Sequence, residues 1–309
     1  MLNIQAQKLM EKAKASGLPP VFHLTANEAR KRMRAGISAD APEAVFQVYD
    51  TFVPCPGHAL GLRIYRPSDE MDLPAIVYLH GGGWVLNDLD THDSICRSLA
   101  NEVQAVVISV DYRRAPEFKY PAPVEDAYSA TEWTFANAEM LGVDPTRIAI
   151  AGDSSGATMA TAVCLLARDR KTIAIKFQML AYPVTDYYLP GTASYKEMAE
   201  GYANTRDFMV WVWNKLLPEN ANLNDPYLCP LRATSFKNLP PAFVMIANYD
   251  PLRDEGEAYA TKLSENGVNV RLKKYDDLMH GFFMQRKVVD AAEKAFEEAV
   301  CALKEGLSK

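Results

Sequence analysis

The chain has 309 residues, which is long for one domain and short for two. A hydrophobic share of 49% with 23% charged residues is ordinary for a globular protein with a sizeable core. The formal net charge of -6 disfavours nucleic acid as a partner, and the one basic cluster, "EARKRMRAG" at 28–36, has the spacing of a solvated helix face.

The first 40 residues carry helix signals. "TANE" at 25–28 is a capping box, in which Thr25 accepts a hydrogen bond from the amide of Glu28 while the Glu28 carboxylate reaches back. Gly36 is the predicted stop of this helix.

From about residue 45 the pattern changes to short apolar runs separated by helix-like stretches. The segments at 44–53 and 60–67 predict a β-hairpin. Six further runs, rich in Val, Ile and Ala, predict strands at 74–80, 105–112, 147–153, 176–183, 241–250 and 270–277. Runs that are apolar on both faces and alternate with helices indicate an α/β fold, with a mainly parallel sheet covered on both sides. In such sheets, sites form beyond the carboxyl ends of the strands.

One interval interrupts the alternation, because no clear strand lies between Pro183 and Pro240. Within it, "TRDFMVWVWNKLL" at 205–217 is aromatic and has helical spacing. A connection this long is expected to be an insertion with its own structure, and such insertions are often lids. We expect a sheet domain formed by residues 46–183 and 219–309. We expect residues 1–45 and 184–218 to form a helical cap over the strand ends.

"AIAGDSSGAT" at 149–158 places Ser154 between a predicted strand and a predicted helix. A strand that turns directly into a helix forces strained backbone angles, so its neighbours must be small, and Gly152 and Gly156 meet that need. The hydroxyl then projects above the sheet at the positive end of a helix. This G-x-S-x-G pattern predicts Ser154 as a nucleophile; the alternative is a tight turn with a serine N-cap.

A glycine loop and one histidine complete this pattern. "HGGGW" at 80–84 follows a predicted strand and exposes backbone N–H groups, which acyl transfer needs to hold an oxyanion. A phosphate cradle is the alternative, but no Lys-Ser or Lys-Thr follows the loop. In a fold of this kind, a catalytic histidine follows the nucleophile and the acid along the chain. Among the five histidines only His280 follows Ser154, so His280 is the predicted base. His80 is expected to fix the glycine loop.

Together these motifs resemble the hormone-sensitive-lipase-like carboxylesterases, bacterial branch, of the α/β-hydrolase fold. The matching segments run in family order over most of the chain: "HGGGW" (80–84), "DYRRAPEFKYPAPVEDA" (111–127), "GDSSGA" (152–157), "DPLRDEG" (250–256) and "HGF" (280–282). The resemblance implies a serine carboxylesterase with a helical cap. Its implied catalytic residues are Ser154, Asp250 and His280, and its implied oxyanion hole consists of Gly82, Gly83 and the amide of Ser155.

The acid that orients His280 is predicted from the position of two aspartates. Asp250 directly follows an apolar run, at the carboxyl end of a predicted strand, whereas Asp254 lies in the first turn of a predicted helix. The helix dipole and the free amides of the first turn explain why an acidic residue stands at position 254. Asp250 has no such structural explanation, so it is the predicted acid. Three positions depart from the family pattern, namely Ser155, where Ala is usual, Ala157, where Gly is usual, and Arg114, where an apolar residue is usual.

The expected ligand is a small-molecule ester of short to medium acyl length, cleaved through an acyl-enzyme intermediate. Bulky aromatic residues predict a confined substrate pocket, namely Trp84, Tyr182, Trp211 and Trp213. No H-E-x-x-H or Cys/His cluster is present, so neither a metal nor a cofactor is expected. Two alternatives stay open: an amidase or peptidase that uses the same residues, and a non-catalytic small-molecule receptor on this scaffold, which is expected to lack the histidine.

The expected location is the cytoplasm, with no membrane partner. "MLNIQAQKLMEKAKAS" at the N-terminus carries charges every few residues, unlike a signal peptide. The five cysteines are dispersed without a C-x-x-C pair, as in proteins with reduced thiols. The longest nearly apolar run, at 158–167, is about half of what a membrane span needs. A homodimer is possible.

Overall fold

The computed structural model describes residues 1–309 and has one sheet of eight strands in the order β1-β2-β4-β3-β5-β6-β7-β8. The strands are β1 Gln47–Cys55, β2 His58–Arg66, β3 Leu73–Leu79, β4 Val106–Asp111, β5 Val143–Asp153, β6 Phe177–Ala181, β7 Ala242–Tyr249 and β8 Val270–Met279. β1 and β2 form an antiparallel hairpin, β2 pairs antiparallel with β4, and the remaining pairs are parallel. The hairpin and all six predicted runs are present, so the predicted α/β class is confirmed.

The central strands are buried on both faces. Every residue of β3 and β6 is buried, as their uninterrupted apolar runs predict. Alternate residues belong to different cores: Ile76 packs with one buried cluster and Val77 with the other, because successive side chains of a strand point to opposite faces. β5 begins at Val143, before the predicted start at residue 147, because Val143 pairs with Leu73 of β3 ahead of a register shift, and regular pairing resumes only at Ile148.

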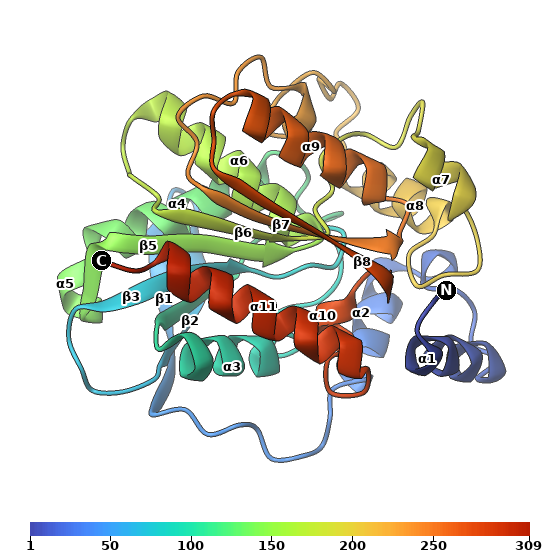
Figure 1. Ribbon diagram of the computed structural model, residues 1–309, viewed down its shortest axis with the longest axis horizontal. Helices are drawn as coiled ribbons and strands as arrows, with labels where there is room; N and C mark the ends of the chain where they lie inside the picture. Colours follow the sequence, from blue (N-terminus) through green and yellow to red (C-terminus); the bar gives the residue numbers. More distant parts are fainter.

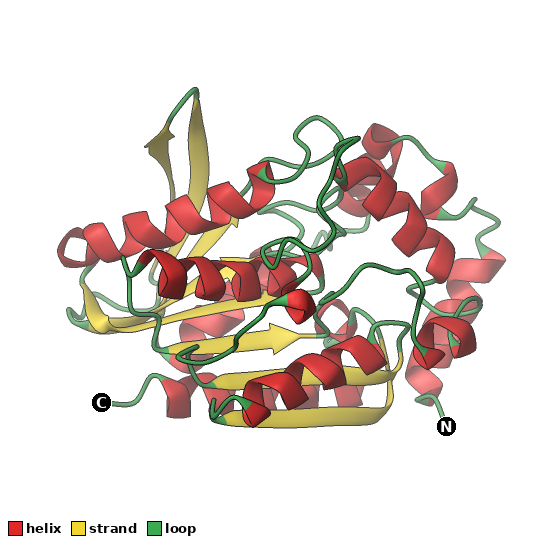
Figure 2. Cartoon of the chain, turned by 90° about the horizontal axis from the view of Figure 1, so that it is seen from above, coloured by secondary structure: helices red, strands yellow, loops and turns green.

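Helices cover both faces of this sheet (Figures 1 and 2). On one face lie α4 (Ala122–Ala136), α5 (Ala138–Leu141), α6 (Ser155–Arg170) and α9 (Arg253–Glu265). On the other lie α3 (Asp93–Val103), α10 (Phe282–Gln285) and α11 (Asp290–Gly306). None of these helices, nor any other in the chain, has both the length and the apolar character needed to cross a bilayer.

Two segments far apart in sequence meet beyond the carboxyl ends of the parallel strands. The first contains α1 (Ile4–Ala15), η1 (Val21–His23) and α2 (Ala26–Ala35), and the second contains α7 (Ala193–Glu197) and α8 (Arg206–Leu216). η1 packs against α8. In Figure 1, α1, α7 and α8 gather at the end to which the arrowheads of β7 and β8 point. A short helix, η2 (Pro230–Arg232), lies in the connection that follows α8.

Helix α2 has the predicted boundaries and a firm attachment to the sheet domain. The amide of Glu28 donates to Thr25 Oγ1 at 3.3 Å, and the amide of Thr25 donates to the Glu28 carboxylate at 2.9 Å, which confirms the capping box. Gly36 is the C-cap. Arg30 donates from Nε to the carbonyl oxygen of Val85 at 2.7 Å, so α2 is tied to the segment that follows the glycine loop.

Candidate active site

Ser154 occupies a tight turn between β5 and α6. Its backbone angles are φ 53° and ψ -124°, a conformation that non-glycine residues rarely adopt. A Cβ on Gly156 would lie 1.9 Å from the carbonyl oxygen of Leu79, and one on Gly152 would lie 2.5 Å from the backbone of Gly156. Both positions therefore require glycine, as predicted. The amide of Ser154 donates to the carbonyl oxygen of Ala181 at 2.9 Å, which fixes the turn to β6.

Three residues from distant segments form one hydrogen-bonded chain. His280 Nε2 lies 3.0 Å from Ser154 Oγ, and His280 Nδ1 lies 2.6 Å from Asp250 Oδ2. The second oxygen of Asp250 accepts from the amide of Leu252 at 3.0 Å, and this carboxylate is buried. A neutral imidazole that donates from Nδ1 to a carboxylate presents the lone pair of Nε2 to the serine hydroxyl.

Asp254 lies apart from this chain and has a structural partner of its own. It is in the first turn of α9, as predicted, but its carboxylate accepts from the amide of Ser194 at 2.8 Å and from Arg253 Nε at 2.9 Å. Burial alone raises the pKa of Asp254, and these hydrogen bonds outweigh burial and lower the pKa. Asp254 thus ties α9 to α7, and does not cap its own helix.

The glycine loop adopts conformations that require glycine. Gly82 has φ 122° and Gly83 has φ 61°. A Cβ on Gly83 would lie 2.4 Å from Val212 Cγ1 of α8, so the loop and α8 approach very closely here. The amides of Gly82, Gly83 and Ser155 donate to no acceptor of the chain, and both glycines line the cavity above Ser154. Free donors beside a serine hydroxyl are what a developing oxyanion requires.

His80 and His92 are buried behind the glycine loop. The Nδ1 of His80 lies 2.9 Å from the carbonyl oxygen of Gly81, and the Tyr112 hydroxyl donates to the carbonyl oxygen of His80 at 2.8 Å. Burial, with the nearby His92, lowers the pKa of His80 to about 3, so the ring is neutral. His92 Nε2 lies 3.3 Å from Asp153 Oδ1. These contacts support the predicted structural role of His80.

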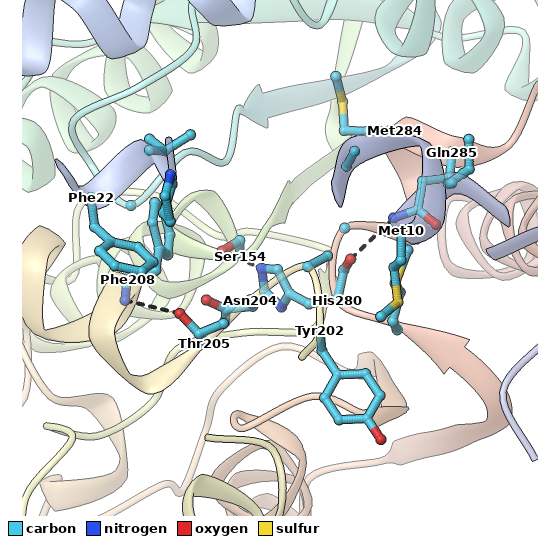
Figure 3. Close-up of a pocket in the computed structure, with 18 of the residues that line it drawn as sticks. Met10, Phe22, Ser154, Tyr202, Asn204, Thr205, Phe208, His280, Met284 and Gln285 are labelled. Carbon is cyan, nitrogen blue, oxygen red and sulfur yellow. Dashed lines mark hydrogen bonds between the residues drawn. The ribbon is translucent and has the colours of Figure 1, made fainter. Parts of the chain in front are cut away.

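A cavity of about 1100 Å³ opens above Ser154 and His280. Its walls come from α1, the segment around η1, and residues 199–208. In Figure 3, Phe22 and Phe208 lie on one side of the Ser154–His280 pair, and Met10 and Met284 lie on the other. The volume suits a small organic molecule.

Of the four aromatic residues predicted to bind substrate, only Tyr182 lines the cavity. The Tyr182 ring lies edge-on to His280 at 4.7 Å between centroids. Trp84 and Trp213 are buried in the core with centroids 5.0 Å apart, and Trp211 lies outside the cavity lining. The prediction for the three tryptophans is therefore corrected, because α8 turns Trp213 toward the core.

The apolar residues of the cavity walls were not predicted. Phe22 and Phe208 line the cavity, as do Met10 and Met284. Phe208 lies in the predicted aromatic helix, so the helical spacing of 205–217 was a signal for it. The order of residues gives no such signal for Phe22, since its place in the wall depends on how η1 packs against α8.

Comparisons with known proteins agree with this fold. A family model described as the alpha/beta hydrolase fold matches residues 76–284. The carboxylesterase NlhH of Mycobacterium tuberculosis is 42% identical over 253 residues, which are 80% of this chain and 78% of that protein. The ethyl acetate hydrolase of Pseudomonas putida is 34% identical over 310 residues, or 97% of this chain and 96% of that one.

A solved structure extends the similarity over nearly the whole chain. The hyperthermophilic esterase of Pyrobaculum calidifontis superposes with a TM-score of 0.93 at 36% identity, covering 98% of each chain. A thermostable esterase of Pseudomonas putida gives a TM-score of 0.95 at 35% identity, over 100% of this chain and 98% of that chain. The chain belongs to the hormone-sensitive-lipase-like family of the α/β-hydrolase fold, and it is a carboxylic ester hydrolase.

Proposed function

We propose that the protein hydrolyses short- to medium-chain acyl esters with Ser154 as the nucleophile, His280 as the base and Asp250 as the acid. The observation that carries the proposal is the unbroken chain of hydrogen bonds from Ser154 Oγ to His280, at 3.0 Å, and from His280 to Asp250, at 2.6 Å. A hydroxyl activated by a neutral imidazole, itself oriented by a carboxylate, is the arrangement that acyl transfer uses.

In the proposed acylation step, His280 Nε2 takes the proton of Ser154 while Oγ bonds to the ester carbonyl carbon. The carbonyl oxygen becomes an oxyanion, which accepts hydrogen bonds from the free amides of the glycine loop and of Ser155. When the tetrahedral intermediate collapses, the bond to the alcohol oxygen breaks and His280 returns the proton to the leaving alcohol. Asp250 stays ionised and stabilises the imidazolium that forms.

In the proposed deacylation step, a water molecule takes the place of the alcohol. His280 removes its proton as the water oxygen bonds to the acyl carbon, and a second oxyanion forms in the same place. Collapse of this intermediate breaks the bond to Ser154 Oγ, which recovers its proton from His280. The carboxylic acid leaves, and the three residues return to their starting states.

The acyl-length preference rests on a cap that we assign to residues 1–45 and 184–218. Residues of both segments line the cavity above Ser154, and η1 of the first packs against α8 of the second. A roofed cavity of about 1100 Å³ accommodates a short or medium acyl chain, whereas a long chain has to displace the roof. We also assign the protein to the cytoplasm, in keeping with its five free cysteines.

The test is a comparison of Ser154→Ala with Ser109→Ala, using p-nitrophenyl butyrate as substrate. Ser109 is a buried serine of β4, so its replacement controls for the loss of a hydroxyl away from the site. We expect Ser154→Ala to abolish turnover and Ser109→Ala to retain it, with both variants folded by circular dichroism. Normal turnover by a folded Ser154→Ala protein contradicts the proposal.

A further inference from the structure

The two residues on either side of Ser154 both hold the glycine loop through their side chains. Asp153 Oδ1 accepts the amide proton of Gly81 at 3.0 Å, and Ser155 Oγ accepts the amide proton of Trp84 at 3.1 Å. The two glycines whose amides are free lie between these anchored residues. Asp153 and Ser155, the sequence neighbours of Ser154, therefore set the distance between the loop amides and the Ser154 hydroxyl.

The Ser155 contact is buried and supports a strained residue. Ser155 and Trp84 are 0% and 2% exposed, so no water replaces the hydroxyl as the acceptor. Trp84 has φ 60°, which a bulky residue keeps only where its surroundings over-determine it. Two hydrogen bonds do so: its amide donates to Ser155, and its carbonyl oxygen accepts from the amide of Ala115 at 2.9 Å.

The hydroxyl of Ser155 has no part in the proton path. The chain of hydrogen bonds from Ser154 runs to His280 and then to Asp250, and Ser155 contacts neither of the last two. The backbone amide of Ser155 is free, whereas its side chain is engaged behind the loop. The backbone amide of Ser155 is therefore available to an oxyanion, whereas its hydroxyl holds the glycine loop.

We propose that Ser155 is a positioning residue for ester cleavage: its hydroxyl holds the Trp84 amide and thereby fixes the loop amides at their distance from Ser154. The inference rests on the proposed function, in which those amides stabilise the oxyanion. Without the hydroxyl, the buried Trp84 amide loses its acceptor and the loop shifts to find another. The oxyanion forms only after substrate has bound, so a shifted loop lowers kcat and leaves KM nearly unchanged.

The experiment compares Ser155→Ala with Ser109→Ala, a matched removal of an equally buried hydroxyl that makes no hydrogen bond to the glycine loop. We expect Ser155→Ala to lower kcat for p-nitrophenyl butyrate by roughly tenfold or more, less than the loss of a whole oxyanion donor. KM should stay within about twofold, and the pH midpoint of kcat/KM should not move, because His280 and Asp250 are untouched. Ser109→Ala should keep the wild-type kcat.

Two further measurements separate positioning from a general loss of structure. A trifluoromethyl ketone, which forms an oxyanion on the serine, should lose affinity for Ser155→Ala by about the factor lost from kcat/KM. Ser155→Thr keeps a hydroxyl, so it should recover most of kcat if its melting temperature equals that of the wild type. If the melting temperature of Ser155→Thr is lower, Ser155→Cys takes its place; because a thiol is a weaker acceptor, it should give an intermediate kcat.

The outcomes also separate this inference from the proposed function. Unchanged kcat in Ser155→Ala, an equal fall in Ser109→Ala, or a rise in KM alone overturns the positioning role. In each case, labelling of Ser154 by a p-nitrophenyl phosphonate, located by mass spectrometry, leaves the proposed nucleophile standing. Labelling at another residue, with full activity in Ser154→Ala, overturns the proposed function itself.

Discussion

The buried neutral His80 should make the protein lose stability in acid by an amount that the structure lets us calculate. The ring is fully buried, and burial with the nearby His92 lowers its pKa from 6.5 to about 3. Because the folded-state pKa is depressed, the unfolded chain binds a proton that the folded chain refuses at any pH between these values. The stabilising contribution is therefore complete above pH 6.5 and is lost progressively as the pH falls toward 3.

One pKa unit corresponds to about 1.4 kcal/mol, so a shift from pH 7 to pH 4.5 should remove about 3 kcal/mol of unfolding free energy through His80 alone. His80→Asn keeps an amide donor near the position of Nδ1 and cannot take up this proton. We expect the wild type to lose about 3 kcal/mol more than His80→Asn between the two pH values.

Urea unfolding followed by tryptophan fluorescence at pH 7 and pH 4.5 measures this difference. The remaining ionisable groups are common to both proteins, so their contributions largely cancel. Equal losses in the two proteins would refute the reasoning, since they would mean that His80 takes up its proton in the folded state as readily as in the unfolded chain.

Three further predictions concern the proposed catalytic machinery. Asp250→Asn should lower kcat by about 10⁴-fold with little change in melting temperature, whereas Asp254→Asn should keep most activity and lose about 1 kcal/mol of stability with its partly buried hydrogen bonds. Kinetics and thermal melts measure both variants, and the reverse pattern would reassign the acid. Gly83→Ala should lower kcat, because its Cβ would lie 2.4 Å from Val212, and Val212→Ala in the same chain should restore part of the loss; no recovery in the double variant would discount this clash. p-Nitrophenyl butyrate should be cleaved much faster than the palmitate, and a preference for emulsified long-chain triglyceride would show that the cap does not restrict the cavity.

The fold and the core of the site were predictable because they follow from local rules. Strands buried on both faces need uninterrupted apolar runs, and β3 and β6 have them. The turn at Ser154 needs glycine on both sides, because the helix and the strands touch there. These requirements leave traces in the order of residues, whatever the rest of the chain does.

The walls of the cavity were not predictable, because they depend on packing between distant segments. A helix with aromatic residues at helical spacing indicates a buried face, but the spacing does not say whether that face meets a core or a cavity. In α8, Phe208 lines the cavity and Trp213 enters the core. The close approach of Val212 to Gly83 determines which side chains of α8 face the cavity, and these two residues are far apart in the chain.

Two of the three departures from the family pattern, Ser155 and Arg114, gain physical explanations only in three dimensions. Arg114 donates to the carbonyl oxygen of Asn87, and the Asn87 side chain donates to the carbonyl oxygen of Gly81 at 3.2 Å. Arg114 therefore acts through Asn87 on Gly81, near the start of the glycine loop, whereas Ser155 holds Trp84 at its end. Both polar residues act on the same loop, one near each end.

Backbone strain around the site indicates a geometry that is set before substrate arrives. Four non-glycine residues near the cavity have positive φ: Trp84 at 60°, Asn87 at 60°, Ser154 at 53° and Tyr182 at 39°. Such conformations cost about 1–3 kcal/mol each and persist only where other contacts impose them. The amide of Tyr182 donates to the carbonyl oxygen of Met245 in β7, as that of Ser154 donates to β6. The amides of Trp84, Ser154 and Tyr182 are thus held by separate partners, so the hydroxyl and the loop amides are in place before substrate binds. We therefore expect movement on substrate entry in the helical segments that line the cavity.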